Sequence, residues 1–491
     1  MPEPVLPAGA ALVPAVVLQI VVGIVDPGTE IVTEVIDYLF HMYDGMPLWA
    51  LPVFLIALVL IIASFVSLIV LIARARRQRR LARRGPQTRE DSSEAEFLWV
   101  YMVPALNEEV TITDSVSRLL EIEVTNKSIL VINDGSDDAT GDILANIDAP
   151  ELTVLTRVAP NARQGKSEAL NDAWRYLHRV VIGQGSFAGW DPQRVIVTIV
   201  DADGRLDRKA WRAAEIFDAD DLCGGVQSQV RIYNRSTFLT WSQDLEFGVF
   251  GSVFQLGRMG WGTANMGGNG QFNRLAALDS VAVEDAHGQV GPWKAGRLTE
   301  DQDIGLRMIH AGWRGAQSGD IVIEQQGLSS LRALYRQRTR WAQGAWQVLD
   351  LLPESVGNRR LSFAARCDQL WYLLTPLIQA WVGLSVLLSV VFLAVGIVVP
   401  DGSIVILVLF YVFSATPGIA GVLFARPPQG LLSVLRNLLL AHAYLIYSWL
   451  IFPVVYRSLI RQLTGRNSWA KTKREAIEPA SAEGVPGDGA A

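Results

Sequence analysis

The chain has 491 residues, half of them hydrophobic, and a formal net charge of −6. The hydrophobic share is high for a soluble protein, and the length allows more than one domain. Two cysteines and five scattered histidines exclude a disulfide framework and a zinc centre. The apolar residues concentrate in positions 1–73 and 370–457, so we expect a membrane protein with an inserted soluble domain.

Two apolar stretches precede the first clear spanning helix. Residues 9–25 are short and follow no basic residue, so they match a signal peptide poorly and either span once or lie in the interface. Residues 30–42 alternate acids with apolar groups at helical spacing, which is typical of an interfacial helix. Residues 48–73 are long enough, at ~1.5 Å per residue, to cross the ~30 Å hydrocarbon core.

A run of arginines occupies positions 74–89, directly after this spanning helix. Such a run could bind nucleic acid or form a solvated linker, but beside a spanning helix the positive-inside rule explains it best. We therefore expect no nucleic-acid partner. The middle domain should lie in the cytosol, in a multi-pass protein of the plasma or inner membrane.

Short β-branched runs alternate with helical patterns across the middle domain. The expected strands are residues 97–103, 129–132, 152–155, 194–200 and 225–232. This order predicts an α/β fold with a largely parallel sheet covered by helices. The carboxyl ends of such strands meet at one crevice, where ligands bind.

Two carboxylates, Asp201 and Asp203, follow the run 194–200 beside Gly204. Like charges this close repel each other unless a cation or a proton lies between them. A divalent metal carrying a diphosphate would fit, because Mg²⁺ binds through one or two carboxylates plus substrate phosphates. The alternative is a turn in which the aspartates cap backbone amides.

Other polar residues follow the neighbouring strands. Asp134 ends the second strand, and Asn107 is expected to cap the helix after the first. Lys166 opens a helix, where a cation opposes the helix dipole by a few tenths of a kcal/mol. A nucleotide diphosphate would compensate for that charge; the alternative is pairing with Glu168 or Asp172.

Thr299 and Gln302 form a capping-box pattern that places Asp301 in the first turn of a helix. Acids in a first turn are expected from the helix dipole alone, which accounts for Glu300 and Asp303. Asp301 is favoured as a catalytic base because the proposed metal-nucleotide crevice otherwise lacks one.

Residues 328–349 form a basic amphipathic pattern that suits the headgroup plane on the cytosolic side. Within it Gln337, Arg340 and Trp341 fall at i, i+3 and i+4, so they share one helix face. That face combines a planar aromatic ring, a fixed cation and an amide. The alternative is an interfacial tryptophan anchor with a snorkelling arginine.

Three further apolar stretches, residues 370–399, 403–424 and 431–455, lead to a basic tail. Three crossings would leave that tail outside, which conflicts with the positive-inside rule. We therefore expect one stretch to lie in the interface or to cross twice, so that the C terminus is cytosolic. His442, Tyr444 and Tyr447 are expected to face a bundle interior or wet cavity.

Taken in order, these motifs resemble the membrane-embedded family 2 glycosyltransferases, which include bacterial cellulose, hyaluronan, chitin and poly-N-acetylglucosamine synthases. The resemblance covers roughly residues 95–350 and the flanking membrane segments. It implies a GT-A fold, a UDP- or GDP-linked sugar donor, and Mg²⁺ or Mn²⁺ as cofactor. Residues 469–472, Trp-Ala-Lys-Thr, resemble the tail of hyaluronan synthases, which supports a cytosolic C terminus.

The resemblance also implies roles for individual residues. It assigns the nucleotide to Asn107, Glu108, Asp134, Lys166 and Asp201, the metal to Asp201 and Asp203, catalysis to Asp301, and the acceptor and pyrophosphate to Gln337, Arg340, Trp341, Glu300, Asn269 and Gln271. Where cellulose synthase has two aromatics before Gly-Ser, this chain has residues 268–271, Gly-Asn-Gly-Gln. The identity of the acceptor therefore does not carry over.

The leading interpretation is an inverting, processive polysaccharide synthase that extrudes its product through its own helices, with accessory membrane subunits as possible partners. Transfer of one sugar to a lipid is the alternative, and an inactive scaffold or transporter subunit is a third. The expected domains are residues 1–90 (membrane segments and basic linker), 91–327 (glycosyltransferase), 328–366 (amphipathic helices), 367–460 (transmembrane region) and 461–491 (a partly disordered tail).

Overall fold

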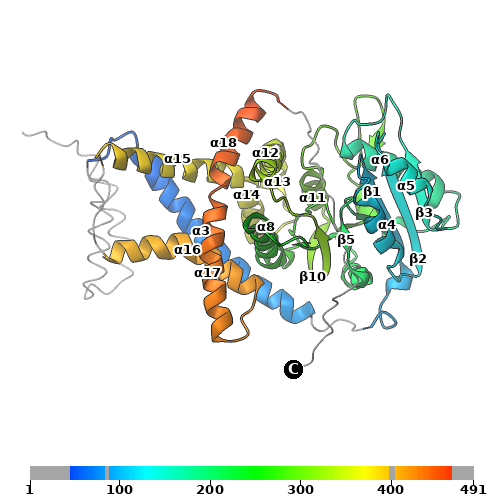
Figure 1. Cartoon of the computed structure of the whole chain (residues 1–491), viewed down its shortest axis with the longest axis horizontal. Helices are drawn as coiled ribbons and strands as arrows, with labels where there is room; N and C mark the ends of the chain where they lie inside the picture. Colours follow the sequence, from blue (N-terminus) through cyan, green and yellow to red (C-terminus); the bar gives the residue numbers. More distant parts are fainter. Residues whose placement is uncertain (1–44, 83–87, 398–403, 467–491) are drawn as a thin grey trace, which may run out of the picture. The chain divides into compact units, whose positions relative to one another are not determined.

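The computed structural model describes residues 45–82, 88–397 and 404–466 (Figure 1). The chain divides into two units, one of Met1–Val66 with Leu377–Ala420 and the other of Ser67–Pro376 with Gly421–Ala491. The features expected in residues 9–25, 30–42 and 469–472 lie outside the described residues. The domain limits inferred from the sequence remain predictions.

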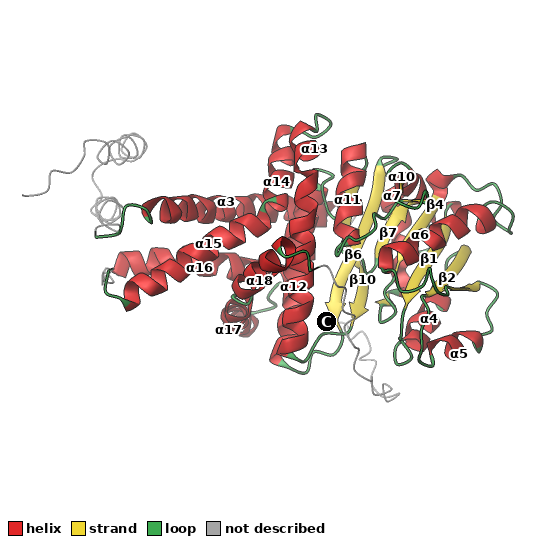
Figure 2. Ribbon diagram, turned by 90° about the horizontal axis from the view of Figure 1, so that it is seen from above, coloured by secondary structure: helices red, strands yellow, loops and turns green. Residues whose placement is uncertain are grey.

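An eight-stranded sheet forms the centre of the larger unit, in the order β3-β2-β1-β4-β7-β6-β10-β5 (Figure 2). Its strands are β1 (Leu98–Ala105), β2 (Asn126–Asn133), β3 (Leu152–Thr156), β4 (Val195–Ile199), β5 (Arg205–Leu206), β6 (Cys223–Ile232), β7 (Gln271–Arg274) and β10 (Arg314–Gln325). Strands β1 to β4 pair in parallel, as do β6 and β10. The mostly parallel GT-A-like sheet predicted from the sequence is confirmed.

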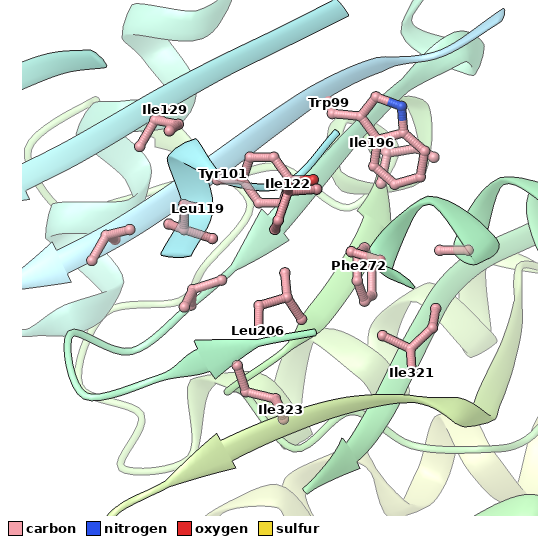
Figure 3. Packing of buried hydrophobic residues seen from close by; sticks show 14 of the residues in the cluster. Trp99, Tyr101, Leu119, Ile122, Ile129, Ile196, Leu206, Phe272, Ile321 and Ile323 are labelled. Atoms are coloured by element: carbon pink, nitrogen blue, oxygen red, sulfur yellow. The ribbon is translucent and has the colours of Figure 1, made fainter. Parts of the chain in front are cut away.

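Helices cover both faces of this sheet, which explains why its strands read as continuous apolar runs. Along β1 the side chains alternate, so Trp99 and Tyr101 enter one core cluster while Val100 and Met102 enter the other. Figure 3 shows the first cluster, in which Trp99 meets Phe272 edge to face with 6.4 Å between ring centroids, a typical distance for such a pair. The covering helices include α4 (Ile112–Leu120), α6 (Lys166–Tyr176), α7 (Ala213–Asp218), α10 (Leu275–Asp279) and α11 (Glu300–Ala311).

Two strands next to the site were not predicted. β7 runs antiparallel between β4 and β6, and it begins at Gln271, directly after the glycine-rich loop. β10 pairs with β6 through two register shifts. Both strands are short or irregular in pattern, so their hydrophobic periodicity is weak.

Three helices among the described residues are long and apolar enough to cross a membrane: Leu51–Ala82, Thr375–Ala394 and Leu431–Leu463. The first is α3 and the second α15, while the third divides into α17 (Leu431–Ser448) and α18 (Ile451–Leu463). A fourth apolar helix, α16, covers Ile404–Ala425.

The stretch expected to span from residue 370 begins instead within α14 (Phe363–Leu373). In α14 the buried Asp368 forms an ion pair at 2.8 Å with the buried Arg258. This polar contact ties α14 to the unit that carries the sheet. At the start of the stretch itself Asn265 donates to the Tyr372 hydroxyl at 2.9 Å and Leu373 is buried, so these first residues pack against protein.

Helix α12 (Leu331–Gln347) carries the basic amphipathic pattern and packs against α18. The Trp346 indole donates to Ser458 Oγ at 3.0 Å, and the Arg461 guanidinium donates to Gln343 Oε1 at 2.9 Å. Helix α18 therefore covers one side of α12. The remaining elements are α5 (Thr140–Ala145), α8 (Phe238–Val249), α9 (Leu256–Met259), α13 (Leu352–Gly357), β8 (Val283–Glu284) and β9 (Val290–Gly291).

Candidate active site

The paired aspartates lie just beyond the carboxyl end of β4, as predicted. The backbone N–H of Asp201 donates to Asn269 Oδ1 at 3.0 Å. The backbone N–H of Gln326 donates to Asp203 Oδ2 at 3.1 Å, and Asp203 is buried. One carboxylate thus caps a backbone amide, as the alternative interpretation expected, although that amide belongs to a distant segment.

Lys166 stands between two carboxylates at the start of α6. Its Nζ lies 2.7 Å from Asp201 Oδ1 and 3.1 Å from Glu300 Oε1. Burial alone would lower the pKa of Lys166, but the charges of Asp201 and Glu300 raise it above its ordinary value. The alternative of pairing with Glu168 or Asp172 is wrong, because the partner carboxylates come from the loop after β4 and from α11.

Asp301 lies in the first turn of α11, as predicted, with Oδ1 accepting the Gln302 N–H at 2.8 Å. Burial and the neighbouring Glu300 charge raise its pKa to about 7, although Lys166 acts in the opposite direction. A carboxylate with a pKa near neutrality suits a general base. The capping box itself is absent, because Thr299 Oγ1 meets the Gln302 side chain at 3.4 Å and caps no backbone amide.

The glycine-rich loop lies against Asp301. Gly268 has a φ of +82°, and a Cβ added there would lie 2.9 Å from Asp301 Oδ2. Glycine is therefore required at this position both for its backbone conformation and for the close approach. The loop brings Asn269, which binds the Asp201 amide, and the base into one crevice.

Helix α12 holds the segment that leads into Asp301. Gln347 Oε1 accepts the Leu298 N–H at 2.9 Å, and the Arg340 guanidinium donates to the Leu298 carbonyl at 3.4 Å. Gly344 lies so close to Thr299 that an added Cβ would come within 2.2 Å of its hydroxyl. The position of the base therefore depends on the packing of α12.

Trp341 contacts protein on its ring face and edge. The Arg338 guanidinium lies 4.1 Å from the centroid of Trp341, and Phe247 meets the ring at 6.1 Å in a T-shaped arrangement. These contacts favour a fixed platform over an interfacial anchor. Gln337, on the same helix face, accepts from Arg338 at 3.0 Å.

The sequence pattern did not identify Arg338 or Glu246 as part of the site. Arg338 is buried rather than facing headgroups, and its guanidinium binds Glu246 Oε2 at 2.6 Å. The spacing of Arg338 and Trp341, i and i+3, could have indicated their contact. Nothing in the sequence pattern pointed to Glu246 in α8.

Asn107 does not cap α4, which begins at Ile112 after Thr111. Asn107 has a left-handed φ of 54°, and its side chain pairs with Asp137 in the loop after β2. Glu108 is buried and accepts from the Thr111 hydroxyl at 3.1 Å. Asn107 thus joins the loops after β1 and β2, where the nucleotide was expected, and the Glu108 N–H donates to Thr140 Oγ1 at 2.8 Å.

Asp134 is buried and bound by two groups. Its Oδ1 accepts from the buried Arg157 guanidinium and from the Arg163 N–H at 2.9 Å. Arg157 was missed in the sequence, although it directly follows β3 at the same edge of the sheet as the predicted carboxylates. Its position directly after a strand end was the signal that could have identified Arg157 as a site residue.

The side-chain amides of Asn269 and Gln271 already have hydrogen-bond partners within the protein. Asn269 is buried and its Nδ2 donates to Gln325 Oε1 at 2.9 Å. Gln271 is buried within β7 and donates to Asn273 Oδ1 at 2.7 Å. The expectation that Gln271 contacts the acceptor is not supported by this geometry, because its side chain belongs to the sheet.

The tyrosines of α17 that were expected to face a bundle interior or a wet cavity pack against protein, which fits the first of these alternatives. Tyr447 donates to Glu246 Oε2 at 2.6 Å and stacks on Tyr444 at 6.0 Å between ring centroids. Both join a cluster with Leu328 and Leu334. His442 is exposed, and its ring lies 2.7 Å from the Leu438 carbonyl of the same helix. None of these contacts supports the lining of a cavity.

A divalent metal fits the donor set at the end of β4. The described residues contain no group of three or more His, Cys, Asp or Glu side chains that could hold a metal on their own. Asp201 and Asp203 would therefore share the ion with phosphate oxygens and water, which is the usual arrangement for Mg²⁺.

Comparison with known proteins gives a consistent match. The model of a family described as glycosyltransferase-like family 2 matches residues 99–344. A β-monoglucosyldiacylglycerol synthase of Synechocystis is 30% identical over 50% of this chain and 47% of its own length. A poly-β-1,6-N-acetyl-D-glucosamine synthase of Staphylococcus aureus is 27% identical over 51% of this chain and 55% of its own. The matched stretch thus spans about half of these relatives.

One solved structure resembles most of the chain. The mannosyltransferase PcManGT of Pyrobaculum calidifontis, in complex with GDP-Man and Mn²⁺, has a TM-score of 0.52 and 16% identity. The similarity covers 84% of this chain and 99% of that one. At this identity the likeness concerns the fold.

The raised pKa of Asp301 has a consequence for stability. An unfolded aspartate titrates near pH 3.9, and the folded one near 7, so the folded state binds more protons between these values and loses stability as the pH rises. We expect Asp301→Asn to stabilise the protein above pH 7 by up to about 4 kcal/mol, because a rise of about three pKa units is worth about 1.4 kcal/mol per unit, and to raise its melting temperature accordingly. Near pH 4 the gain should vanish.

Thermal unfolding at pH 4.5 and 8.5 checks this expectation. Asp148→Asn, at an exposed position, is the matched control and should show no such difference. An equal shift for Asp301→Asn at both pH values would contradict the raised pKa.

The packing of Gly344 on Thr299 gives a second prediction. In Gly344→Ala the new methyl group must displace the Thr299 side chain, and overpacking of this kind costs about 1–3 kcal/mol. Gly357→Ala, where nothing lies within 4 Å, is the control. A lower melting temperature for the first variant alone is expected; equal stability of the two would refute the tight contact.

Proposed function

The chain belongs to glycosyltransferase family 2, and from this membership we propose that it transfers a sugar from a nucleotide sugar to an acceptor hydroxyl with inversion at the anomeric carbon. The observation that carries the proposal is the position of Lys166. It contacts Asp201 on the donor side and Glu300 beside the base. The carboxylate proposed to bind the donor and the proposed base therefore lie in one crevice.

The donor nucleotide, UDP or GDP, would lie over the loops after β1 and β2. Asn107 and Glu108 come from the first loop and Asp134 from the second. Asn107 pairs with Asp137 of the second loop, and the Glu108 N–H donates to Thr140 at the start of α5, so these segments are joined before a ligand arrives. Preorganised loops lower the ordering cost of binding.

The diphosphate would lie at Asp201 and Asp203, with Lys166 as a further cation. Mg²⁺ or Mn²⁺ held there supplies Lewis-acid stabilisation of the departing nucleoside diphosphate. The N terminus of α6 points to the same anion, because Lys166 opens that helix. These groups orient the donor and neutralise the charge of the leaving group.

Asp301 accepts the proton of the acceptor hydroxyl as its oxygen bonds to the anomeric carbon. The bond from that carbon to the phosphate oxygen breaks on the opposite face, and an α-linked donor gives a β-linked product. Arg340 would stabilise the pyrophosphate, and Trp341 would stack on the acceptor sugar or headgroup. Arg338 and Glu246 hold the platform in place.

For the acceptor we favour a lipid hydroxyl at the membrane surface. Glu246 binds Arg338, which stacks on Trp341, and it also binds Tyr447 of α17. The platform is therefore three contacts from a candidate span. A lipid needs only a lateral approach, whereas the tyrosines proposed for a glycan path are packed against protein. A 30% identical relative is named for a glucosyl-diacylglycerol product.

Extension of a polysaccharide, with extrusion through the protein's own helices, is the second candidate. The 27% identical relative named as a poly-β-1,6-N-acetyl-D-glucosamine synthase favours it. The ring of Trp341 is only half-buried, and it could serve the terminal sugar of a chain as well as a lipid. The two candidates share the donor site and the base.

We further propose that the sheet-bearing unit and the C terminus face the cytosol of a multi-pass membrane protein. The basic end of α3, which includes Arg79 and Arg80, supports this orientation. The nucleotide sugar would then be taken directly from the cytosol.

Substitutions of the base and of a metal ligand should change transfer and donor binding differently. We expect Asp301→Asn to lower transfer by at least ~10²-fold, the range for losing a general base, while nucleotide affinity stays nearly constant. Asp203→Ala should abolish transfer and metal-dependent donor binding. Activity assays and calorimetry with Mg²⁺ or Mn²⁺ check both; full activity in excess chelator would remove the metal from the proposal.

Product analysis separates the two acceptors. Purified protein in diacylglycerol-containing nanodiscs, supplied with a panel of UDP- and GDP-sugars, should yield an organic-extractable lipid carrying a single sugar. Long water-soluble or insoluble glycans made without that lipid would establish the polymer candidate instead. Absence of either product with every donor would count against the transfer reaction itself.

Topology is testable with single cysteines in a Cys367→Ser background, because Cys367 is the exposed native thiol of the described residues. We expect Ser468→Cys to resist an impermeant reagent on intact cells. Ser403→Cys, between α15 and α16, should be labelled and serves as the control. Labelling of Ser468→Cys on intact cells would contradict the cytosolic C terminus.

A further inference from the structure

A buried aspartate in α8 collects three arginines from separate segments. Asp244 is fully buried, and its Oδ1 accepts the Ile232 N–H at 3.0 Å. Its Oδ2 lies 2.8 Å from Arg426, 3.6 Å from Arg235 and 3.8 Å from Arg231. These arginines follow α16, occupy the loop after β6, and lie in β6 itself.

The cluster carries more positive charge than Asp244 can balance. One carboxylate meets three guanidinium groups, and among the described residues no other acid forms an ion pair with any of the three. The side chains of Arg231, Arg235 and Arg426 are 30%, 41% and 25% exposed. Like charges held this close are unfavourable unless an anion joins them, and the exposed parts are open to one.

Further positive charge lies beside the cluster. The Arg79 guanidinium donates to the Phe424 carbonyl at 2.9 Å and lies 4.1 Å from the centroid of that ring. Phe424 lies in the last turn of the apolar helix α16, two residues before Arg426, and Arg79 lies in the basic last turn of α3. Basic residues at the ends of apolar helices are expected at the level of the lipid headgroups.

An apolar surface adjoins the arginines. Asn437 of α17 donates to the Arg426 carbonyl at 2.8 Å, which ties the start of α17 to the cluster. On that helix Leu431, Leu432 and Leu435 are 77%, 84% and 50% exposed. A ligand with both an anionic head and an apolar body fits this combination, whereas a free anion would leave the leucines uncovered.

We propose that Arg231, Arg235 and Arg426 bind the phosphate of an anionic membrane lipid whose acyl chains lie along the start of α17. The site is distinct from the acceptor site at Trp341 and does not depend on the proposed transfer reaction. Bound lipid would neutralise the excess charge around Asp244 and fix α8, which carries Glu246 toward Arg338.

The test is binding of a fluorescent phosphatidylglycerol to the detergent-solubilised full chain. Arg231→Gln/Arg235→Gln leaves the close Arg426–Asp244 pair intact. Because each arginine near an anionic surface contributes about 1 kcal/mol, we expect this variant to bind roughly 10- to 30-fold more weakly. Arg208→Gln/Arg314→Gln removes the same charge at two exposed surface positions and should bind like the unmodified protein.

Two further binding measurements distinguish a lipid phosphate from free inorganic phosphate. Phosphatidylcholine with the same acyl chains should bind at least several-fold more weakly, and inorganic phosphate should displace the anionic lipid poorly. Equal affinity of the two double variants, with unchanged melting temperatures, would overturn the site. Displacement by inorganic phosphate at low concentration would overturn the assignment to lipid. Asp244→Asn makes the cluster more positive, so this variant should bind phosphatidylglycerol more tightly than the unmodified protein.

Discussion

The ion pairs of Lys166 are the constraint on which the rest of the site depends. A single ammonium group lies within 3.1 Å of one carboxylate from the loop after β4 and one from α11. Without it Asp201, Glu300 and Asp301 would repel one another across a buried crevice. With it, the donor carboxylates and the catalytic base keep a fixed distance, and the pKa of Asp301 stays near neutrality.

Helix α12 contacts both this crevice and the network that leads to helix α17. One end of its contact network fixes the segment before Asp301 through Leu298 and Thr299. The other passes through Arg338 and Glu246 to α17. The same helix therefore supports both the base and the acceptor platform, which accounts for its many polar side chains in buried positions.

The sequence predicted the parts of the molecule whose pattern is local. β1, β2 and β4 are continuous apolar runs, and Lys166 and Asp301 were placed at helix starts by local signals. Contacts between distant segments could not be read in this way. Asn107 pairs with a loop 30 residues later instead of capping its own helix, Gln271 is drawn into the antiparallel β7, and Arg338 is buried by Glu246.

The pH dependence of the single-turnover transfer rate, at saturating donor and Mn²⁺, tests the central claim most directly. Asp301 must be deprotonated to accept the acceptor proton, and its pKa is raised to about 7. The account predicts a rate that rises with pH and reaches a plateau above an apparent pKa near 7. A rate that is constant from about pH 5 to 9, or that falls as the pH rises, would contradict it.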